Sequence, residues 1–483
     1  MNRLATSARA RIGLGLFSFV VLGVLILNRP VPVLQDYDQP FYITVGYDLY
    51  RWGVFSNGIV ADSESKTDTD SNTRPPPGMF FGPVYPVLVY AAMKLDPRFA
   101  AAVRCSVEAD RDNRDYSACD RYVLPMRLLN AFLLSIAVVA LASAAEIIFA
   151  RRWIFVLTGA IALGALACEA LIFSFVMTEA TIFSLYSGFA LVNLLAWKSG
   201  RLRYFLLAGL LLGLLCLTKP SFLVMFPCVL GLSALYLYWL AKPRPACVLR
   251  YLVLFSLAFA IPVGGWATRN LAAVGKFGLT EEYGSAALIE RFAYDDMTAR
   301  EFLQAFPYCT PGIGELAFRN GDSMHRFVYS TKGSFFQVGR DRRDALTDTY
   351  HRLDPLIGGI VRDEMQARWW RYLLVSVPLV WCGMWPGWLV SLLAVPLFAG
   401  ACIRSIRKRE PLFLLYTLPT LVNLALDGLV GNTATRYNLI LIGPYAIGAA
   451  SLLAPWLETG NWPLSFHRFS LRSAGAAAEQ DVT

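Results

Sequence analysis

Long uncharged apolar stretches recur along this 483-residue chain, and they constrain its fold more than any other feature. A helix that crosses a bilayer needs roughly 20 predominantly apolar residues. Stretches near that length lie at about 13–27, 122–149, 153–170, 180–197, 204–217, 221–241, 251–268, 386–403, 411–427 and 437–456. We therefore expect an all-α polytopic membrane protein with about ten transmembrane helices.

The composition excludes several other classes of protein. Only 16% of the residues are charged and 56% are hydrophobic, whereas a soluble globular chain carries about 25% charged residues. The same figures exclude intrinsic disorder. Nine cysteines in a chain of this length do not form a small disulfide scaffold. A plain cytosolic enzyme is therefore not expected.

The placement of lysine and arginine predicts the orientation, because cytoplasmic loops carry an excess of these residues. With the N-terminus inside, the inner loops carry Arg151 and Arg152; Lys198, Arg201 and Arg203; Lys242, Arg244 and Arg250; Arg404, Arg407, Lys408 and Arg409; and, in the tail, Arg468 and Arg472. We expect both termini on the cytoplasmic side of an inner (plasma) membrane. This placement accounts for much of the net charge of +9, so no nucleic-acid partner is expected.

Two long outer segments result from this orientation, at about 28–121 and 269–371. Each contains a run with apolar residues at helical spacing, at 41–52 and at 354–370, which is typical of a helix lying along the membrane interface. The second of these runs either helps to shape an acceptor site or rests on lipid headgroups, and we favour the headgroup interpretation. Residues 1–456 form one transmembrane domain in this view, and 457–483 a disordered cytoplasmic tail.

Two carboxylates, Asp36 and Asp38, lie directly after the first predicted span. A carboxylate at that depth can act as a general base or hold a metal ion where a lipid headgroup arrives. The alternative is that both residues merely cap the interfacial helix that follows them. The spacing alone does not decide between the two interpretations.

Four further polar spots fall at outer ends of spans. They are Glu179 after Thr178, Lys219 before Pro220, Arg269 with Asn270, and Arg436 with Tyr437. A lone cation at a helix end is explained by interface anchoring. Three such cations on the outer side, near carboxylates, are what binding a phosphate group at the outer leaflet requires.

In their order along the chain, these motifs resemble those of GT-C fold membrane glycosyltransferases of the protein-mannosyltransferase and aminoarabinose-transferase type. The family pattern opens with an acidic residue followed four positions later by Tyr, which Asp38 and Tyr42 match. Later elements are matched by Gly82-Pro83-Val84-Tyr85-Pro86, Thr178-Glu179, Thr218-Lys219-Pro220, Arg269-Asn270 and Arg436-Tyr437. The resemblance covers about 12–456. It departs from the pattern at Gln39-Pro40, and the extra Asp36 leaves the choice of catalytic carboxylate open.

The resemblance implies transfer of a sugar, with inversion, from a polyprenyl-phosphate carrier to a lipid, polysaccharide or protein acceptor at the extracytoplasmic face. Asp38 would be the general base, with Asp36 or Glu179 orienting it or supplying negative charge. The carrier phosphate would be held by Lys219, Arg269, Arg436 and Tyr437. The donor and acceptor pocket would include Tyr42, Tyr85 and Asn270.

The residues do not favour a dedicated metal site or a bound cofactor. Asp36, Asp38 and Glu179 offer three carboxylates to a divalent ion, but no well-placed histidine accompanies them. Of the nine cysteines, Cys105 and Cys119 can form a disulfide in an oxidising compartment, and Cys309 is another outer candidate. The remaining cysteines are expected to be small apolar packing residues.

Two other classes of function stay open at this point. A transporter or flippase of polyprenyl-linked glycolipids would show inverted repeats and charged residues near the membrane midplane. Here the singled-out charges gather at one interface, and no inverted repeat is visible. A non-catalytic membrane assembly partner with the same fold is the other alternative, and substitution of Asp38 would separate it from a transferase.

Overall fold

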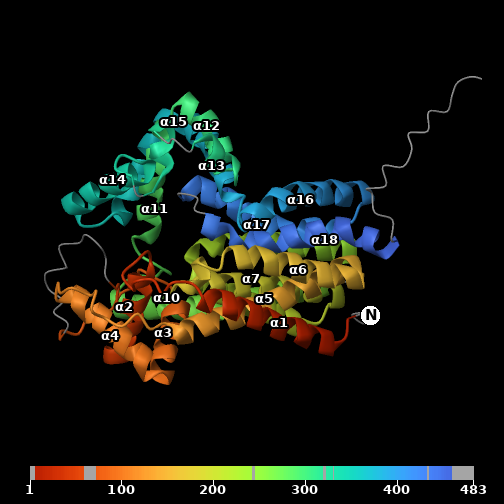
Figure 1. Ribbon diagram of the computed structural model, residues 1–483, viewed down its shortest axis with the longest axis horizontal. Coiled ribbons are helices and arrows are strands. Elements are labelled where there is room, and N and C mark those ends of the chain that lie inside the picture. The colour runs from red at the N-terminus through yellow and green to blue at the C-terminus, as the bar shows by residue number, and fades with distance from the viewer. Residues whose placement is uncertain are drawn as a thin grey trace, which may run out of the picture.

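The computed structural model describes residues 6–58, 72–241, 245–318, 322–329, 331–431 and 435–459. Within these ranges every regular element is a helix. Long helices lie side by side in one bundle, and shorter helices gather at one end of it (Figure 1). The expected all-α polytopic architecture is confirmed. Residues 460–483 of the predicted tail lie outside the described residues.

Eight described segments are long and apolar enough to cross a membrane. They are α1 (Ala8–Leu27), α5 (Leu124–Phe149), α7 (Glu179–Ser199), Pro220–Ala241 with η3 (Pro220–Val224), α9 (Met225–Leu235) and η4 (Tyr236–Ala241), α10 (Pro245–Val274), α16 (Leu389–Lys408), α17 (Pro411–Val430), and Thr435–Pro455 with η7 (Thr435–Leu441) and α18 (Ile442–Thr459). Two shorter apolar helices, α6 (Arg152–Cys168) and α8 (Leu202–Thr218), fall at the two remaining predicted spans. Each of the ten predicted stretches therefore coincides with an apolar helix.

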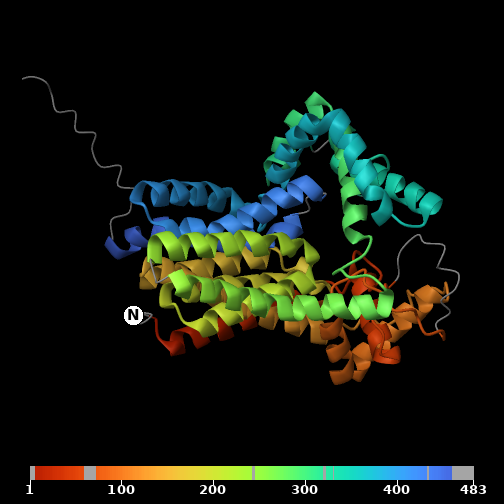
Figure 2. The ribbon, with the colours of Figure 1, turned by 180° about the vertical axis from the view of Figure 1, so that it is seen from behind.

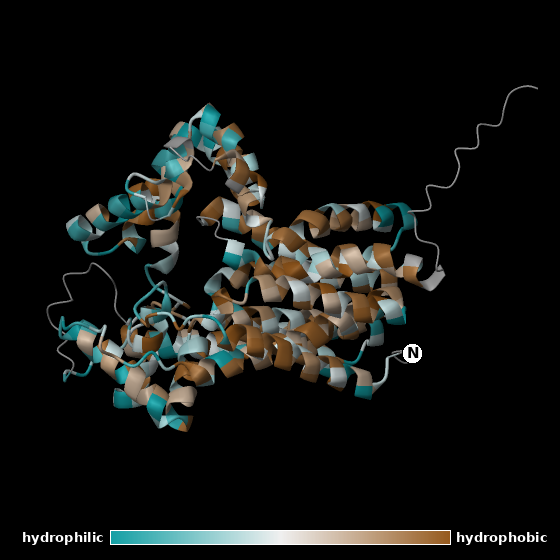
Figure 3. Cartoon of the chain, viewed as in Figure 1, coloured by the Kyte–Doolittle hydropathy of each residue, from teal (hydrophilic) through white to brown (hydrophobic). Residues whose placement is uncertain are grey.

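Hydrophobic residues make up most of the bundle, while hydrophilic residues concentrate at its two ends and in the shorter helices (Figure 3). Small residues let the spans pack closely. A Cβ added at Gly209 of α8 would lie 2.2 Å from the carbonyl oxygen of Phe255 in α10, which is closer than real Cβ contacts. Backbones that approach this closely gain the van der Waals contact that drives helix association in lipid.

The helices of both predicted outer segments lie at the same end of the bundle, opposite the N-terminus (Figure 1, Figure 2). The first segment forms α2 (Gln39–Trp52), α3 (Val84–Leu95) and α4 (Pro97–Arg111). The second forms α11 (Tyr283–Phe292), η5 (Ala293–Asp296), α12 (Ala299–Cys309), α13 (Ile313–Ala317), η6 (Asp322–Phe327), α14 (Phe335–Tyr350) and the start of α15 (Asp354–Gly383). The short η2 (Ile172–Ser174) lies between α6 and α7. The shared side of the two segments agrees with the predicted topology; the side of the membrane that they face stays a prediction.

Two features differ from the expectations. The helix predicted over 354–370 continues as α15 to Gly383, with a local break in the backbone at Arg368, where φ is −143° and ψ is 24°. Cys382, expected to be an apolar packing residue, instead forms a disulfide with Cys309 because α12 packs against α15. A second disulfide joins Cys105 of α4 to Cys119.

Candidate functional site

Asp38 immediately precedes α2, but its side chain makes no hydrogen bond that caps the helix. Its carboxylate Oδ2 instead accepts a hydrogen bond from Nη2 of Arg436 at 2.7 Å. Asp36 is exposed, and its Oδ2 accepts from the backbone N–H of Val33 at 3.2 Å. The two carboxylates, which the sequence left equivalent, therefore have different surroundings: Asp36 serves a local turn and Asp38 contacts a distant cation.

Arg436, at the start of η7, lies between two carboxylates. Besides Asp38, it faces Glu179, with 3.7 Å between Nη1 and Oε1. It also donates to the hydroxyl of Tyr437 at 2.9 Å. Glu179 is the first residue of α7, and its side chain is only 7% exposed. Its second oxygen, Oε2, is buried without a hydrogen-bond partner among the described residues, so it is available to a ligand or water.

Lys219 brings a second cation to this cluster. It directly follows the end of α8, and its Nζ lies 3.7 Å from the centroid of the Tyr437 ring. Burial lowers the pKa of the Lys219 ammonium, and the nearby carboxylates of Asp427 and Glu179 partly offset that shift. Two cations, Lys219 and Arg436, thus share one region with the carboxylates of Asp38, Glu179 and Asp427.

Buried polar side chains fix the two loops that carry Asp38 and Glu179 against each other. The side-chain oxygen of Gln39, next to Asp38, accepts from the backbone N–H of Val176 at 2.8 Å. Arg127 of α5 donates to the carbonyl oxygens of Pro30 at 2.7 Å and Ser174 at 3.2 Å. Because the bonds to Val176 and Ser174 are buried, they hold the carboxylates in position before any ligand binds.

The Gly82-Pro83-Val84-Tyr85-Pro86 motif packs against the end of α8, just before Lys219. A Cβ added at Gly82 would lie 2.0 Å from the carbonyl oxygen of Leu217, so only glycine allows this approach. Pro83 then precedes the first turn of α3, which begins at Val84. The motif therefore positions the turn that carries Lys219.

Replacing Gly82 with alanine is expected to destabilise the protein by about 1–3 kcal/mol, because the backbone must move apart to admit the methyl group. Thermal unfolding in detergent would show a lower Tm. Gly264→Ala is the matched control, since a Cβ at Gly264 meets no atom within 4 Å. Equal Tm values for the two variants would contradict the close approach.

Aromatic rings line the cluster next to Asp38. The Tyr42 ring lies 5.1 Å from that of Tyr85 and 5.4 Å from that of Phe81, centroid to centroid. Phe81 also contacts Tyr283 of α11 at 6.1 Å. Burial, and then the Asp38 and Glu179 carboxylates, raise the pKa of the Tyr42 phenol well above its usual value, so this hydroxyl remains a neutral donor.

Arg269 and Asn270 make structural contacts. Arg269 donates to the carbonyl oxygens of Gly78 at 2.7 Å and Phe55 at 3.1 Å. Asn270 is fully buried and donates to the carbonyl oxygen of Gly278 at 2.8 Å. These bonds connect the C-terminal part of α10 to loops of both outer segments. The predicted roles of both residues in binding a substrate stay predictions.

A separate group of three carboxylates is formed by Glu281, Glu282 and Asp354, whose ligand atoms lie within 4.8 Å of one another. The carboxylate of Glu282 accepts a hydrogen bond from the backbone N–H of Asp354 at 3.1 Å. The carboxylate of Asp354 in turn accepts one from the backbone N–H of Glu282 at 3.0 Å. Glu281 pairs with Lys276. Reciprocal capping of α11 and α15 explains this group, and none of the residues predicted to be catalytic belongs to it.

Two residues of the cluster were missed by sequence analysis. Asp427 lies on α17, four residues after Asn423, whose amide donates to it at 3.3 Å. A carboxylate within an apolar span was the available signal. Tyr283 opens α11, close enough to Asp38 and Arg436 for their charges to act on its phenol. No motif in the sequence marked Tyr283, because its position depends on how the second outer segment folds back.

Comparisons with known proteins give little further support. No protein-family model matches the chain, and no curated protein matches it. Among solved structures, ArnT from Cupriavidus metallidurans bound to undecaprenyl phosphate is similar with a TM-score of 0.37 and 14% identity, over 95% of this chain and 82% of that one. The apo state of the same protein gives a TM-score of 0.33 at the same identity and coverage. A likeness this distant carries no inference about function.

Proposed function

We propose that the protein is a membrane glycosyltransferase that moves a sugar from a polyprenyl-phosphate carrier to an acceptor hydroxyl at the extracytoplasmic face. One observation carries the proposal: Arg436 lies between the carboxylates of Asp38 and Glu179, and Lys219 lies beside its neighbour Tyr437. A candidate base and two candidate phosphate ligands therefore meet at one end of the bundle. The order of the sequence motifs supports the same assignment.

In this mechanism, Arg436 and Lys219 would bind the carrier phosphate, which is the leaving group. The bond between the anomeric carbon and the phosphate oxygen breaks, and negative charge grows on the phosphate. Preorganised cations in a site shielded from water stabilise such charge strongly. Arginine offers a planar fork to two phosphate oxygens and lysine a point charge.

Asp38 would take the proton of the acceptor hydroxyl as its oxygen bonds to the anomeric carbon from the face opposite the phosphate, which inverts the configuration. Oδ2 of Asp38 is engaged by the hydrogen bond from Nη2 of Arg436. We infer that the arriving phosphate competes for the guanidinium of Arg436 and frees Asp38 to act. Glu179, which also faces Arg436, would keep that guanidinium oriented during the exchange.

Mass spectrometry of envelope glycolipids and glycans tests the proposed function. A strain that lacks the gene would be compared with the same strain complemented by the wild-type gene or by Asp38→Asn, at equal membrane levels of protein. We expect one glycan to lack a single sugar in the deletion and Asp38→Asn strains, and the missing mass would identify the sugar. Full restoration by Asp38→Asn would instead favour a transporter or a non-catalytic partner.

Binding of the carrier phosphate is expected to weaken as the pH becomes alkaline. The weakening should begin at a lower pH than it would if Lys219 had the pKa of an ordinary lysine. Burial lowers the pKa of Lys219, so its positive charge is present below that lowered pKa and is lost as the pH rises through it. The measurement is KM for the donor as a function of pH. In Lys219→Arg, the side chain stays charged, and the alkaline rise in KM should disappear. An identical rise in both proteins would exclude Lys219 as its cause.

A further inference from the structure

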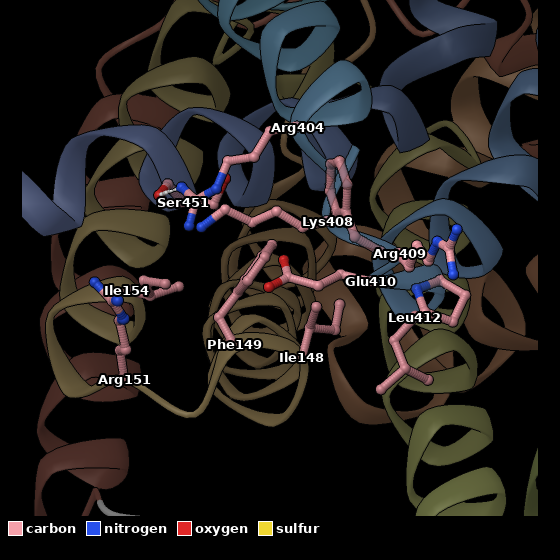
Figure 4. A pocket seen from close by; sticks show the side chains of 12 residues that line it. Ile148, Phe149, Arg151, Ile154, Arg404, Lys408, Arg409, Glu410, Leu412 and Ser451 are labelled. Carbon is pink, nitrogen blue, oxygen red and sulfur yellow. Dashed lines mark hydrogen bonds between the residues drawn. The ribbon is translucent and has the colours of Figure 1, made fainter. Parts of the chain in front are cut away.

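A cavity of about 410 Å³ lies at the other end of the bundle, remote from Asp38 and on the side of the N-terminus (Figure 1, Figure 4). It is formed where the turn between α5 and α6, the turn between α16 and α17, and α18 come together. Its volume is that of a site for a small ligand. The proposed transfer reaction makes no use of it.

Cations dominate the polar part of the lining. Four of the lining residues are basic, Arg151, Arg404, Lys408 and Arg409, and one is acidic, Glu410. The side chains of Arg404 and Lys408 extend toward the side of the cavity where Arg151 lies, and Arg409 points the other way (Figure 4). Without Arg409, the lining carries a formal excess of two positive charges, which favours an anionic ligand.

One of these cations is held in place by a bond to the neighbouring helix. Arg404 donates from Nη1 to the carbonyl oxygen of Ser451 in α18 at 2.9 Å. Ser451 is a buried residue of the lining, so this bond fixes the guanidinium of Arg404 against α18. The turn that follows brings Glu410 across the cavity, because Arg409 adopts a left-handed backbone with φ of 55° and Pro411 starts α17. The arrangement is more ordered than a flexible basic loop.

The remaining walls are apolar. They are formed by Ile148, Phe149, Ile154, Pro411, Leu412 and Phe413. Ile154 and Phe413 are almost completely buried. A free inorganic anion gains nothing from apolar walls, whereas a lipid places a charged headgroup directly next to acyl chains.

We propose that this cavity binds the phosphate-bearing headgroup of an anionic phospholipid in the leaflet at this end of the bundle. Basic pockets between transmembrane helices on the cytoplasmic side are suited to such headgroups. The positive-inside rule, which sets the orientation of membrane proteins, requires only exposed lysine and arginine near the membrane. It does not require a cavity with apolar walls and a guanidinium bonded to an adjacent helix. The inference does not depend on the proposed transferase activity.

Native mass spectrometry of the full-length protein in detergent tests the proposal, with phosphatidylglycerol as the probe. Removing two cations in Arg404→Gln/Lys408→Gln is expected to weaken binding roughly 30-fold, at about 1 kcal/mol per cation. The matched control is Arg203→Gln/Arg407→Gln, which removes two cations from the same end but none from the lining. Equal weakening in both double variants would overturn the site and leave only general surface attraction.

A gain of binding provides a test that misfolding cannot imitate. Glu410→Gln removes the single negative charge of the lining, so it should bind phosphatidylglycerol more tightly than the wild type. Unchanged or weaker binding by Glu410→Gln would contradict the proposal.

The choice of lipid tests the ligand itself. Phosphatidylcholine, whose headgroup has no net charge, should bind less well than phosphatidylglycerol, and equal binding would overturn recognition by charge. Displacement of the lipid by excess inorganic phosphate would overturn the lipid as the natural ligand.

Discussion

Replacing Asp38 with asparagine is expected to lower the rate of sugar transfer by roughly 10²- to 10⁴-fold, which is the usual contribution of a general base. Asparagine has nearly the same shape and keeps a side-chain oxygen that can accept the hydrogen bond from Arg436. The fold should therefore persist while the proton acceptor is lost. The measurement is kcat of the purified protein with saturating donor and acceptor, together with Tm.

Asp36→Asn is the matched control for this experiment. The two residues have the same chemistry and are two positions apart, but Asp36 is exposed and contacts the backbone of Val33. We expect Asp36→Asn to leave kcat nearly unchanged. A large loss in Asp36→Asn with little loss in Asp38→Asn would assign the base to Asp36 and contradict the proposed mechanism.

Replacing Arg436 with glutamine should reduce both activity and stability. The substitution leaves the buried carboxylate of Glu179 without the cation that it faces at 3.7 Å. Breaking a buried ion pair on one side costs about 3 kcal/mol or more. Loss of a preorganised group that stabilises developing charge lowers the rate by roughly 10²- to 10³-fold. The measurements are Tm in detergent and kcat/KM for the donor.

A second substitution separates the two effects. In Arg436→Gln/Glu179→Gln, no buried charge is left unpaired at this position, so much of the lost stability should return. Transfer should stay slow, because the cation that binds the phosphate is still missing. If the double variant also regained activity, Arg436 would have only a structural role. Arg436→Lys keeps the charge without the planar fork, so its rate of transfer should lie between those of the wild type and Arg436→Gln.

The sequence was sufficient to predict the membrane-spanning architecture, because the physical requirement is local. A stretch such as 251–268 carries no charged residue over its whole length, and lipid requires its backbone to be helical. The interfacial pattern at 41–52 was equally local and corresponds to α2 (Gln39–Trp52). Both predictions depended only on residues that are close in the chain.

The composition of the candidate site could be predicted only in part, because its contacts join distant residues. Asp38 and Arg436 are separated by 398 positions, and the sequence indicated only that both lie at the same membrane face. Arg269 shows the limit of that reasoning, since it belongs to the same face but bonds to the backbone of Phe55 and Gly78. The membrane face on which residues lie predicts which of them can come into contact, whereas the packing of the helices and loops determines which contacts form.

The two disulfides give the orientation of the chain a chemical consequence. Cys105–Cys119 joins α4 to the loop that follows it, and Cys309–Cys382 joins α12 to α15, both at the end of the bundle that carries Asp38. Disulfides persist in oxidising compartments and are reduced in the cytosol. With the predicted orientation, the bridges form only after these loops have crossed the membrane. A chain inserted the opposite way would present four thiols to cytosolic reductants, so thiol labelling can distinguish correctly inserted molecules from inverted ones without reference to activity.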